Sequence, residues 1–138
     1  MTGVQTCASS DLVLLWFCKG DERLPLKVRE LIADESNEVY YSLLSVFEVE
    51  IKHAAHPDRI SIDGERLLKH CQTLEFVQIP LEVAHILEVK KLTRKENTPP
   101  HRDPFDRLML GQAIVESMLF ITHDARIAEY TCPLIYKI

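Results

Sequence analysis

Hydrophobic positions along this 138-residue chain follow two patterns that alternate from one end to the other. Short apolar or β-branched runs predict buried strands, and apolar residues repeating every three to four positions predict amphipathic helices. The expected strands cover residues 12–17, 39–42, 76–79, 119–122 and 133–136. The expected helices cover residues 24–33, 45–55, 63–74, 82–92, a helix that opens at Pro104, and residues 124–130.

Strands that alternate with helices predict an α/β fold with right-handed crossovers and a parallel sheet covered on both faces. The run L-V-L-L-W-F at 12–17 is apolar throughout, as in a strand buried on both faces, and is expected at the centre of the sheet. Residues 1–11 have turn-like or polar composition and show no periodicity. No repeat or linker divides the chain, so we expect one domain over residues 1–138.

Composition narrows the class of protein. Hydrophobic residues make up 46% and charged residues 27%, which is typical of a globular protein. No apolar run approaches the roughly 20 residues that span a bilayer, and no signal peptide is evident, so a cytoplasmic protein without a membrane partner is expected. Four scattered cysteines predict neither a zinc site nor a disulfide framework. The net charge of −5 argues against coating nucleic acid, but not against a nuclease whose acids hold a divalent cation.

The stretch H-R-D-P-F-D-R-L-M-L-G-Q-A, from His101 to Ala113, places two carboxylates at the start of a helix. Pro104 suits the first helical position, so Asp103 falls at the N-cap and Asp106 on the same helix face. The spacing is typical of a well-capped helix or of half a metal site, and taken alone it does not decide between them.

Two further acids share the position of this pair relative to the sheet. Glu48 follows the strand at 39–42, and Asp124 follows the strand at 119–122. Each acid alone has an ordinary interpretation, as a solvated helix residue or a cap. Together they converge on the carboxyl edge of a parallel sheet, where ligands bind. Two carboxylates at about 4 Å repel by roughly 4 kcal/mol at an effective dielectric near 20, so such a site needs a hard divalent cation, Mg²⁺ or Mn²⁺. His101 and His123 flank the acids, but their spacing assigns them no catalytic role.

These segments resemble the PIN-domain family, in its VapC-like toxin group. The matching pieces are V-L-L-W-F with G-D-E-R-L, V-Y-Y-S-L-L-S-V-F-E, H-R-D-P-F-D-R-L-M-L-G-Q-A and L-F-I-T-H-D, from about Asp11 to Ile138. The resemblance implies a three-layer α/β/α domain with a central, mostly parallel sheet of four to five strands. It also implies a Mg²⁺- or Mn²⁺-dependent endoribonuclease, the toxin of a toxin–antitoxin pair, with an RNA substrate, a small antitoxin partner and a homodimer as a common assembly.

The resemblance also assigns roles to single residues. The acids implied in catalysis are Glu48, Asp103, Asp106 and Asp124; the metal ligands are Glu48, Asp106 and Asp124, with Asp11 as a further candidate; the substrate contacts are Arg102, Arg107 and Thr122.

The amino-terminal residues do not match the family. Counting back from Trp16 places the family's first aspartate at Ser10, and the preceding M-T-G-V-Q-T-C-A lacks the aliphatic residues of the family's first strand. Residues 1–10 therefore form an atypical head, foreign or disordered, which resembles a translated sequencing adapter. The alternative is a divergent start in which Asp11 supplies the carboxylate one position late. A catalytically impaired PIN scaffold that binds RNA or an antitoxin without cleaving is thus the second functional hypothesis.

Overall fold

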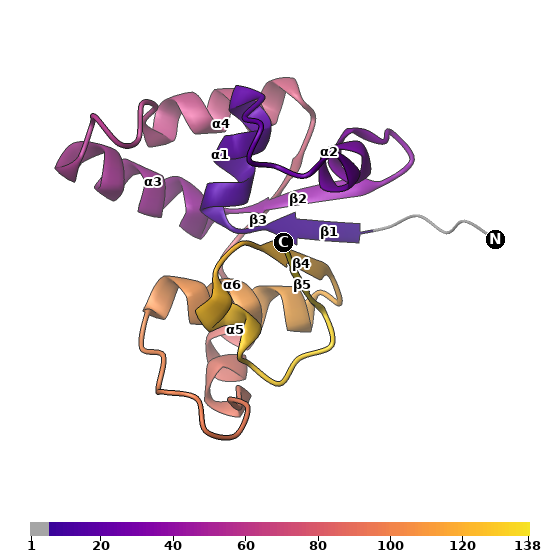
Figure 1. The fold of residues 1–138 in the computed structure, drawn as a ribbon, viewed down its shortest axis with the longest axis vertical. Helices are drawn as coiled ribbons and strands as arrows, with labels where there is room; N and C mark the ends of the chain where they lie inside the picture. Colours follow the sequence, from indigo (N-terminus) through magenta and orange to yellow (C-terminus); the bar gives the residue numbers. More distant parts are fainter. Residues whose placement is uncertain (1–5) are drawn as a thin grey trace.

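The computed structural model describes residues 6–138, which form an α/β fold (Figure 1). In chain order the elements are β1 (Thr6–Ser9), α1 (Asp11–Lys19), α2 (Leu26–Ala33), β2 (Glu38–Ser42), α3 (Leu43–Ala55), α4 (Gly64–Thr73), β3 (Val77–Ile79), α5 (Val83–Glu88), the 3₁₀-helix η1 (Val89–Lys91), α6 (Pro104–Val115), β4 (Leu119–Thr122), α7 (Ala125–Ala128) and β5 (Ile135–Lys137).

The five strands form one parallel sheet in the order β3-β2-β1-β4-β5. Helices α1 to α4 lie on one side of this sheet, and α5 and α6 lie on the other (Figure 1). The expected three-layer α/β/α arrangement with a parallel sheet is therefore confirmed, at the upper end of the expected strand number. After β3 the chain crosses to the far side of β1, so the strand order reverses between β1 and β4.

The central strand is not where the hydrophobic pattern placed it. Residues 12–17, predicted as a strand, belong to α1, and the central strand is β1, which pairs with both β2 and β4. The prediction was wrong because four successive residues of α1, from Val13 to Trp16, are buried, and a helix buried on most sides is as uniformly apolar as a buried strand. Residues 6–10, part of the head expected to be foreign or disordered, instead form the central strand and the N-cap of α1, so that expectation was wrong for them. The expectation for residues 1–5 lies outside the described residues.

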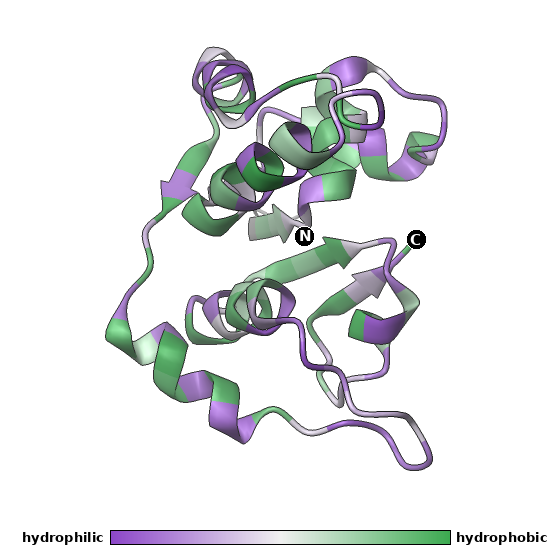
Figure 2. Cartoon of the chain, turned by 90° about the vertical axis from the view of Figure 1, so that its left-hand side faces the viewer, coloured by the Kyte–Doolittle hydropathy of each residue, from purple (hydrophilic) through white to green (hydrophobic). Residues whose placement is uncertain are grey.

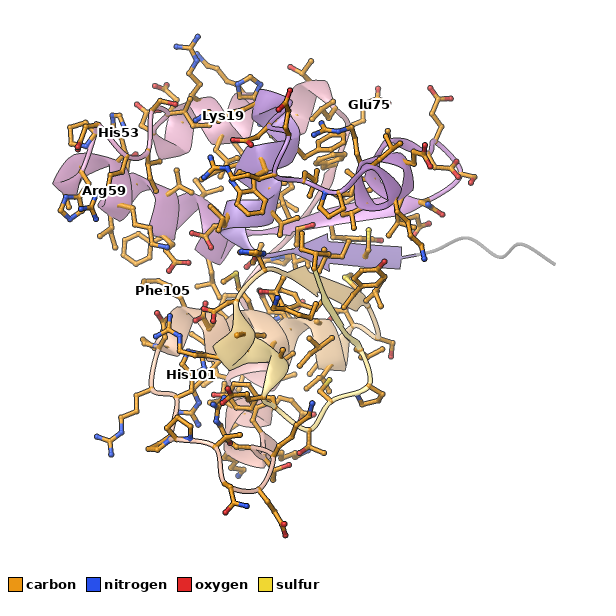
Figure 3. All side chains as sticks on the ribbon, in the orientation of Figure 1. Lys19, His53, Arg59, Glu75, His101 and Phe105 are labelled. Atoms are coloured by element: carbon orange, nitrogen blue, oxygen red, sulfur yellow. The ribbon has the colours of Figure 1, made fainter. Side chains whose placement is uncertain are left out.

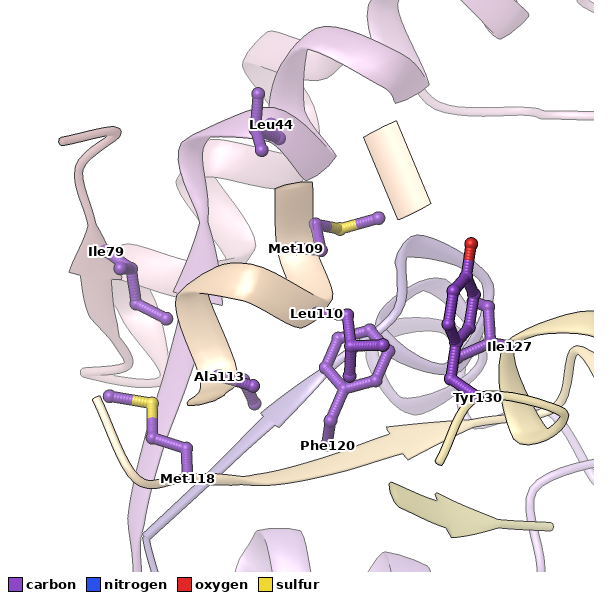
Figure 4. Packing of buried hydrophobic residues seen from close by; sticks show 10 residues of the cluster. Leu44, Ile79, Met109, Leu110, Ala113, Met118, Phe120, Ile127 and Tyr130 are labelled. Atoms are coloured by element: carbon purple, nitrogen blue, oxygen red, sulfur yellow. The ribbon is translucent and has the colours of Figure 1, made fainter. Parts of the chain in front are cut away.

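The core divides into clusters on the two faces of the sheet. On the α6 side of the sheet, Met109 and Leu110 of α6 pack with Phe120 of β4 and with Ile127 of α7 (Figure 4). On the other side, Trp16 and neighbouring side chains of α1 pack against α2 and the strands, and a third cluster joins α1 to α3 and α4. The strands and inner helices are largely hydrophobic, whereas the long loop that precedes α6 is mostly hydrophilic (Figure 2).

A buried hydrogen bond ties the two layers together beside the sheet edge. The Ser42 hydroxyl at the end of β2 donates to Gln112 Oε1 of α6 at 2.5 Å and accepts from the backbone N–H of Leu44. The same contact therefore caps α3 and fixes α3 relative to α6. No helix in the described part of the chain is long and apolar enough to cross a membrane.

Candidate functional site

A pocket of about 380 Å³ opens at the carboxyl edge of the sheet, where the strand order reverses between β1 and β4. Such a switch point is where open α/β sheets bind ligands. Five carboxylates line the pocket, and they come from four helices or their caps: Asp11, Glu48, Asp103, Asp106 and Asp124. All the acids singled out in the sequence therefore converge on one site, which we call the acid pocket.

Three of these acids are close enough to share one cation. Glu48, Asp103 and Asp106 each offer a carboxylate oxygen, and these oxygens lie within 4.8 Å of one another. Ligands on opposite sides of a Mg²⁺ ion are about 4.2 Å apart, since each Mg–O distance is about 2.1 Å. Glu48 Oε1 is buried and has no hydrogen-bond partner among the described residues. An oxygen-only set with an unsatisfied buried carboxylate oxygen fits Mg²⁺ or Mn²⁺.

The start of α6 sets the direction of two of these ligands. Asp103 is the N-cap, and its Oδ1 accepts from the backbone N–H groups of Phe105 (2.9 Å) and Asp106 (3.2 Å). Pro104 occupies the first turn, as predicted. Because capping uses Oδ1, Oδ2 of Asp103 remains available to the pocket. Asp103 is therefore both the cap of α6 and a candidate metal ligand.

Charge crowding is visible in the pKa values of the two most buried ligands. Burial, followed by the charge of Asp11, raises the pKa of Glu48 to about 7, although Lys52 opposes this shift. Burial and the neighbouring charges, Asp103 first, raise the pKa of Asp106 to about 7. Both carboxylates therefore resist ionisation in the metal-free protein, as expected when no cation compensates the charges.

The two other acids form ion pairs with basic side chains. Asp11 Oδ2 lies 3.0 Å from Lys52 Nζ, and Asp124 Oδ2 lies 3.2 Å from the Arg126 guanidinium. Partial burial would raise the pKa of Asp124, but its hydrogen bonds with Arg126 hold that pKa below the usual value. Burial lowers the pKa of Lys52, but the charges of Asp11 and Glu48 outweigh it and keep this pKa above its usual value.

His101, in the loop before α6, lies beside one acid of the pocket. Its Nε2 is 3.1 Å from Asp106 Oδ2, but neither ring nitrogen has a hydrogen-bond partner among the described residues, and the side chain is almost fully buried. The ring packs against Tyr130, whose hydroxyl donates to the His101 backbone carbonyl at 3.3 Å. Burial and the nearby arginine charges lower the pKa of His101. Figure 3 shows that His101 and Phe105 lie on the side of the sheet that carries α6.

The loop that carries His101 is held by Arg94. Its guanidinium pairs with Glu129 at 2.7 Å, donates to the Pro99 carbonyl at 3.0 Å and lies over the Tyr130 ring. These contacts fix the polar loop against the segment that follows α7, and so they fix the position of His101.

The three residues expected to contact substrate lie outside the lining of the acid pocket. Arg102 is exposed and Arg107 half-buried. Thr122 is fully buried, and its hydroxyl accepts from the Asp124 N–H at 3.1 Å, so it shapes the turn after β4. Sequence reasoning missed Lys52 and Arg126, which do line the pocket. The spacing of Lys52 four residues after Glu48 was the available signal.

A second group of metal-ligand side chains, Glu82, His85 and Glu116, lies away from the acid pocket. Here the backbone N–H of Glu82 donates to His85 Nδ1 at 3.0 Å, so Nε2 carries the ring hydrogen and donates to Glu116 at 3.0 Å. Both ring nitrogens are used, and the group is a helix cap rather than a metal site.

The sequence profile of the PIN domain matches residues 12–131, a range that holds four of the five acids and leaves out Asp11. The chain belongs to the PIN domain family. No curated protein matches its sequence.

The PIN fold of the chain is similar to two solved toxin–antitoxin structures. One is VapBC2 from Rickettsia felis bound to a DNA fragment from its promoter, with a TM-score of 0.66 at 14% identity, covering 97% of this chain and 98% of the other. The second is DNA-bound VapBC from Salmonella typhimurium, with a TM-score of 0.61 at 16% identity, covering 98% and 97%. At this identity the likeness concerns the fold.

Proposed function

We propose that this PIN domain is a Mg²⁺- or Mn²⁺-dependent endoribonuclease that hydrolyses RNA phosphodiester bonds. The observation that carries the proposal is the group formed by Glu48, Asp103 and Asp106, with a buried Glu48 oxygen lacking a partner. A divalent ion bound there supplies Lewis-acid stabilisation of a phosphate and activation of a water.

The residues of the chain hold that chemistry in place. Glu48, Asp103 and Asp106 are the proposed ligands, and Asp124 adds a further carboxylate to the lining of the pocket. Arg126 lines the same pocket and is mostly exposed, so its guanidinium is available to a substrate phosphate. Direct RNA contacts by Arg102 and Arg107 stay a prediction.

A cleavage assay tests this function. Purified protein is incubated with single-stranded and structured RNA with Mg²⁺, and with Mg²⁺ replaced by EDTA. We expect metal-dependent cleavage that the D106N variant loses by at least 100-fold, with H70A on α4 as a matched control. Metal-independent cleavage, or equal rates for D106N and wild type, would contradict the proposal.

A second candidate function is a PIN scaffold that binds RNA or an antitoxin without cleaving. The observation that favours it is the position of Ser10, buried in the pocket lining where the family's first acid is expected. The S10D variant separates the two. Cleavage by S10D but not by wild type favours an impaired enzyme, and no cleavage by either sinks the nuclease proposal.

We also propose an antitoxin partner, which would act with the PIN domain in the cytoplasm. Leu43, Phe47 and Ile51 form an exposed apolar stripe along α3, the helix that also carries Glu48, and Phe47 packs edge-on against Phe105 of α6. A partner that covers this stripe would bury the apolar side chains that α3 exposes. Co-purification with a small protein encoded beside the gene, lost in the F47D variant, would support this partner.

A homodimer is the second assembly we propose. Val83 and Leu87 of α5 are exposed apolar residues close to Leu81, and this surface lies away from the acid pocket. A dimer in light scattering that becomes a monomer in V83D would support this face as the interface.

A further inference from the structure

Lys52 places its ammonium group between two carboxylates of the acid pocket. Its Nζ lies 3.0 Å from Asp11 Oδ2 and 3.3 Å from Glu48 Oε2. The two acidic side chains are only 9% and 7% exposed, so water screens their charges poorly. The ammonium is therefore the main neutralising charge for Asp11.

The five carboxylates divide into three sets by the cation each can use. Asp11 uses Lys52, and Asp124 uses Arg126. The third set, Glu48, Asp103 and Asp106, has oxygens close enough to share one ion. Glu48 connects the Lys52 set with the metal-binding set, because one of its oxygens contacts Lys52 and the other has no hydrogen-bond partner among the described residues.

A second divalent ion cannot occupy the space between Asp11 and Glu48 while Lys52 is there. Mg²⁺ binds carboxylate oxygens at about 2.1 Å, so an ion on Asp11 Oδ2 and Glu48 Oε2 would overlap the volume that Nζ fills. Two positive centres at such short range also repel strongly. Binding of a second ion therefore requires that Lys52 leave both acids.

We propose that Lys52 is a positioning residue that serves as the built-in second positive centre of the site, so that the pocket takes one divalent ion. Glu48, Asp103 and Asp106 hold that ion, and Lys52 orients Glu48 toward it. This inference rests on the proposed metal-dependent function and specifies its stoichiometry.

Mn²⁺ titration of the full chain, followed by the electron paramagnetic resonance signal of free Mn²⁺, tests the inference without RNA. Wild type should bind one Mn²⁺ per chain. K52M should bind a second, weaker ion, because Asp11 loses its cation, and the double variant K52M/D11N should return to one. K69M, which removes an exposed lysine from α4, is the matched control and should stay at one.

The outcomes separate this inference from the nuclease proposal. Two ions on wild type, with one lost in D11N, would overturn the role of Lys52; D11N gives this answer even where K52M fails to fold. One ion on K52M with unchanged affinity would also overturn it. Stoichiometric binding of one ion without RNA cleavage leaves the inference standing while the nuclease proposal fails. The absence of Mn²⁺ binding in wild type overturns both.

Discussion

At the scale of single residues, His101 gives the sharpest prediction. Its Nε2 contacts Asp106 Oδ2 at 3.1 Å, which restricts the orientations open to that carboxylate. Outer-sphere contacts of this kind typically change metal affinity by about 10- to 100-fold. We expect H101A to weaken Mn²⁺ binding at least tenfold, and H101Q, which keeps a polar side chain beside Asp106, to restore part of the loss. Calorimetric Mn²⁺ titrations measure this, with H70A as the control. Equal affinities for H101A and wild type would remove His101 from the site.

Single residues also show which parts of the candidate site could be predicted from the sequence and which could not. The acids were predictable because each follows a strand or opens a helix, a position that local pattern reports. The pairing of Lys52 with Asp11 was not, since it joins residues 41 positions apart on two helices. Likewise, His101 was known to flank the acids, but its contact with Asp106 depends on the loop that Arg94 anchors. Such contacts arise from tertiary packing, which spacing does not encode.

At the scale of elements, the start of α6 combines two roles that a matched pair of variants separates. Serine is a good N-cap but has no carboxylate, whereas alanine is neither cap nor ligand. We expect D103S and D103A to lose Mn²⁺ affinity equally, while D103A alone loses roughly 1 kcal/mol of unfolding free energy relative to D103S. Metal titration and urea unfolding of the metal-free proteins measure the two effects. Equal stability of the two variants would show that the cap contributes little.

The helices and strands were predicted correctly except near the amino terminus, where β1 was missed and a strand was predicted in place of α1. The helices after residue 23 and strands β2 to β5 lie close to their predicted places, because turn residues and apolar periods mark their ends. Around β1 the pattern misled, since Cys7, Ala8 and Ser9 are small and carry little strand propensity. Their place at the centre is set by pairing with β2 and β4 rather than by their own composition.

At the scale of the whole molecule, the sheet order explains why the acids meet. The reversal between β1 and β4 opens one edge of the sheet, and α1, α3, α6 and the turn after β4 all present acids there. The fold thus concentrates negative charge at a single point. That concentration has a cost in stability when no cation is bound, and the cost depends on pH.

The pKa values of Glu48 and Asp106, both about 7, fix the sign of this dependence. In the unfolded chain these acids have pKa values near 4, so between about pH 4 and 7 the folded state holds protons that the unfolded state has released. The free energy of unfolding of the metal-free protein should therefore fall as pH rises through this window, by an amount on the order of several kcal/mol because each pKa unit is worth about 1.4 kcal/mol, and stay low above pH 7. Mn²⁺ should restore stability at pH 8, where the ligands are ionised.

Thermal unfolding at pH 5.5 and 8, in EDTA or Mn²⁺, measures both effects. D106N should reduce the change of unfolding free energy with pH in EDTA and also reduce the stabilisation by Mn²⁺, because it removes one of the two titrating ligands. A pH dependence as steep in D106N as in wild type would mean that the loss of stability arises elsewhere in the molecule.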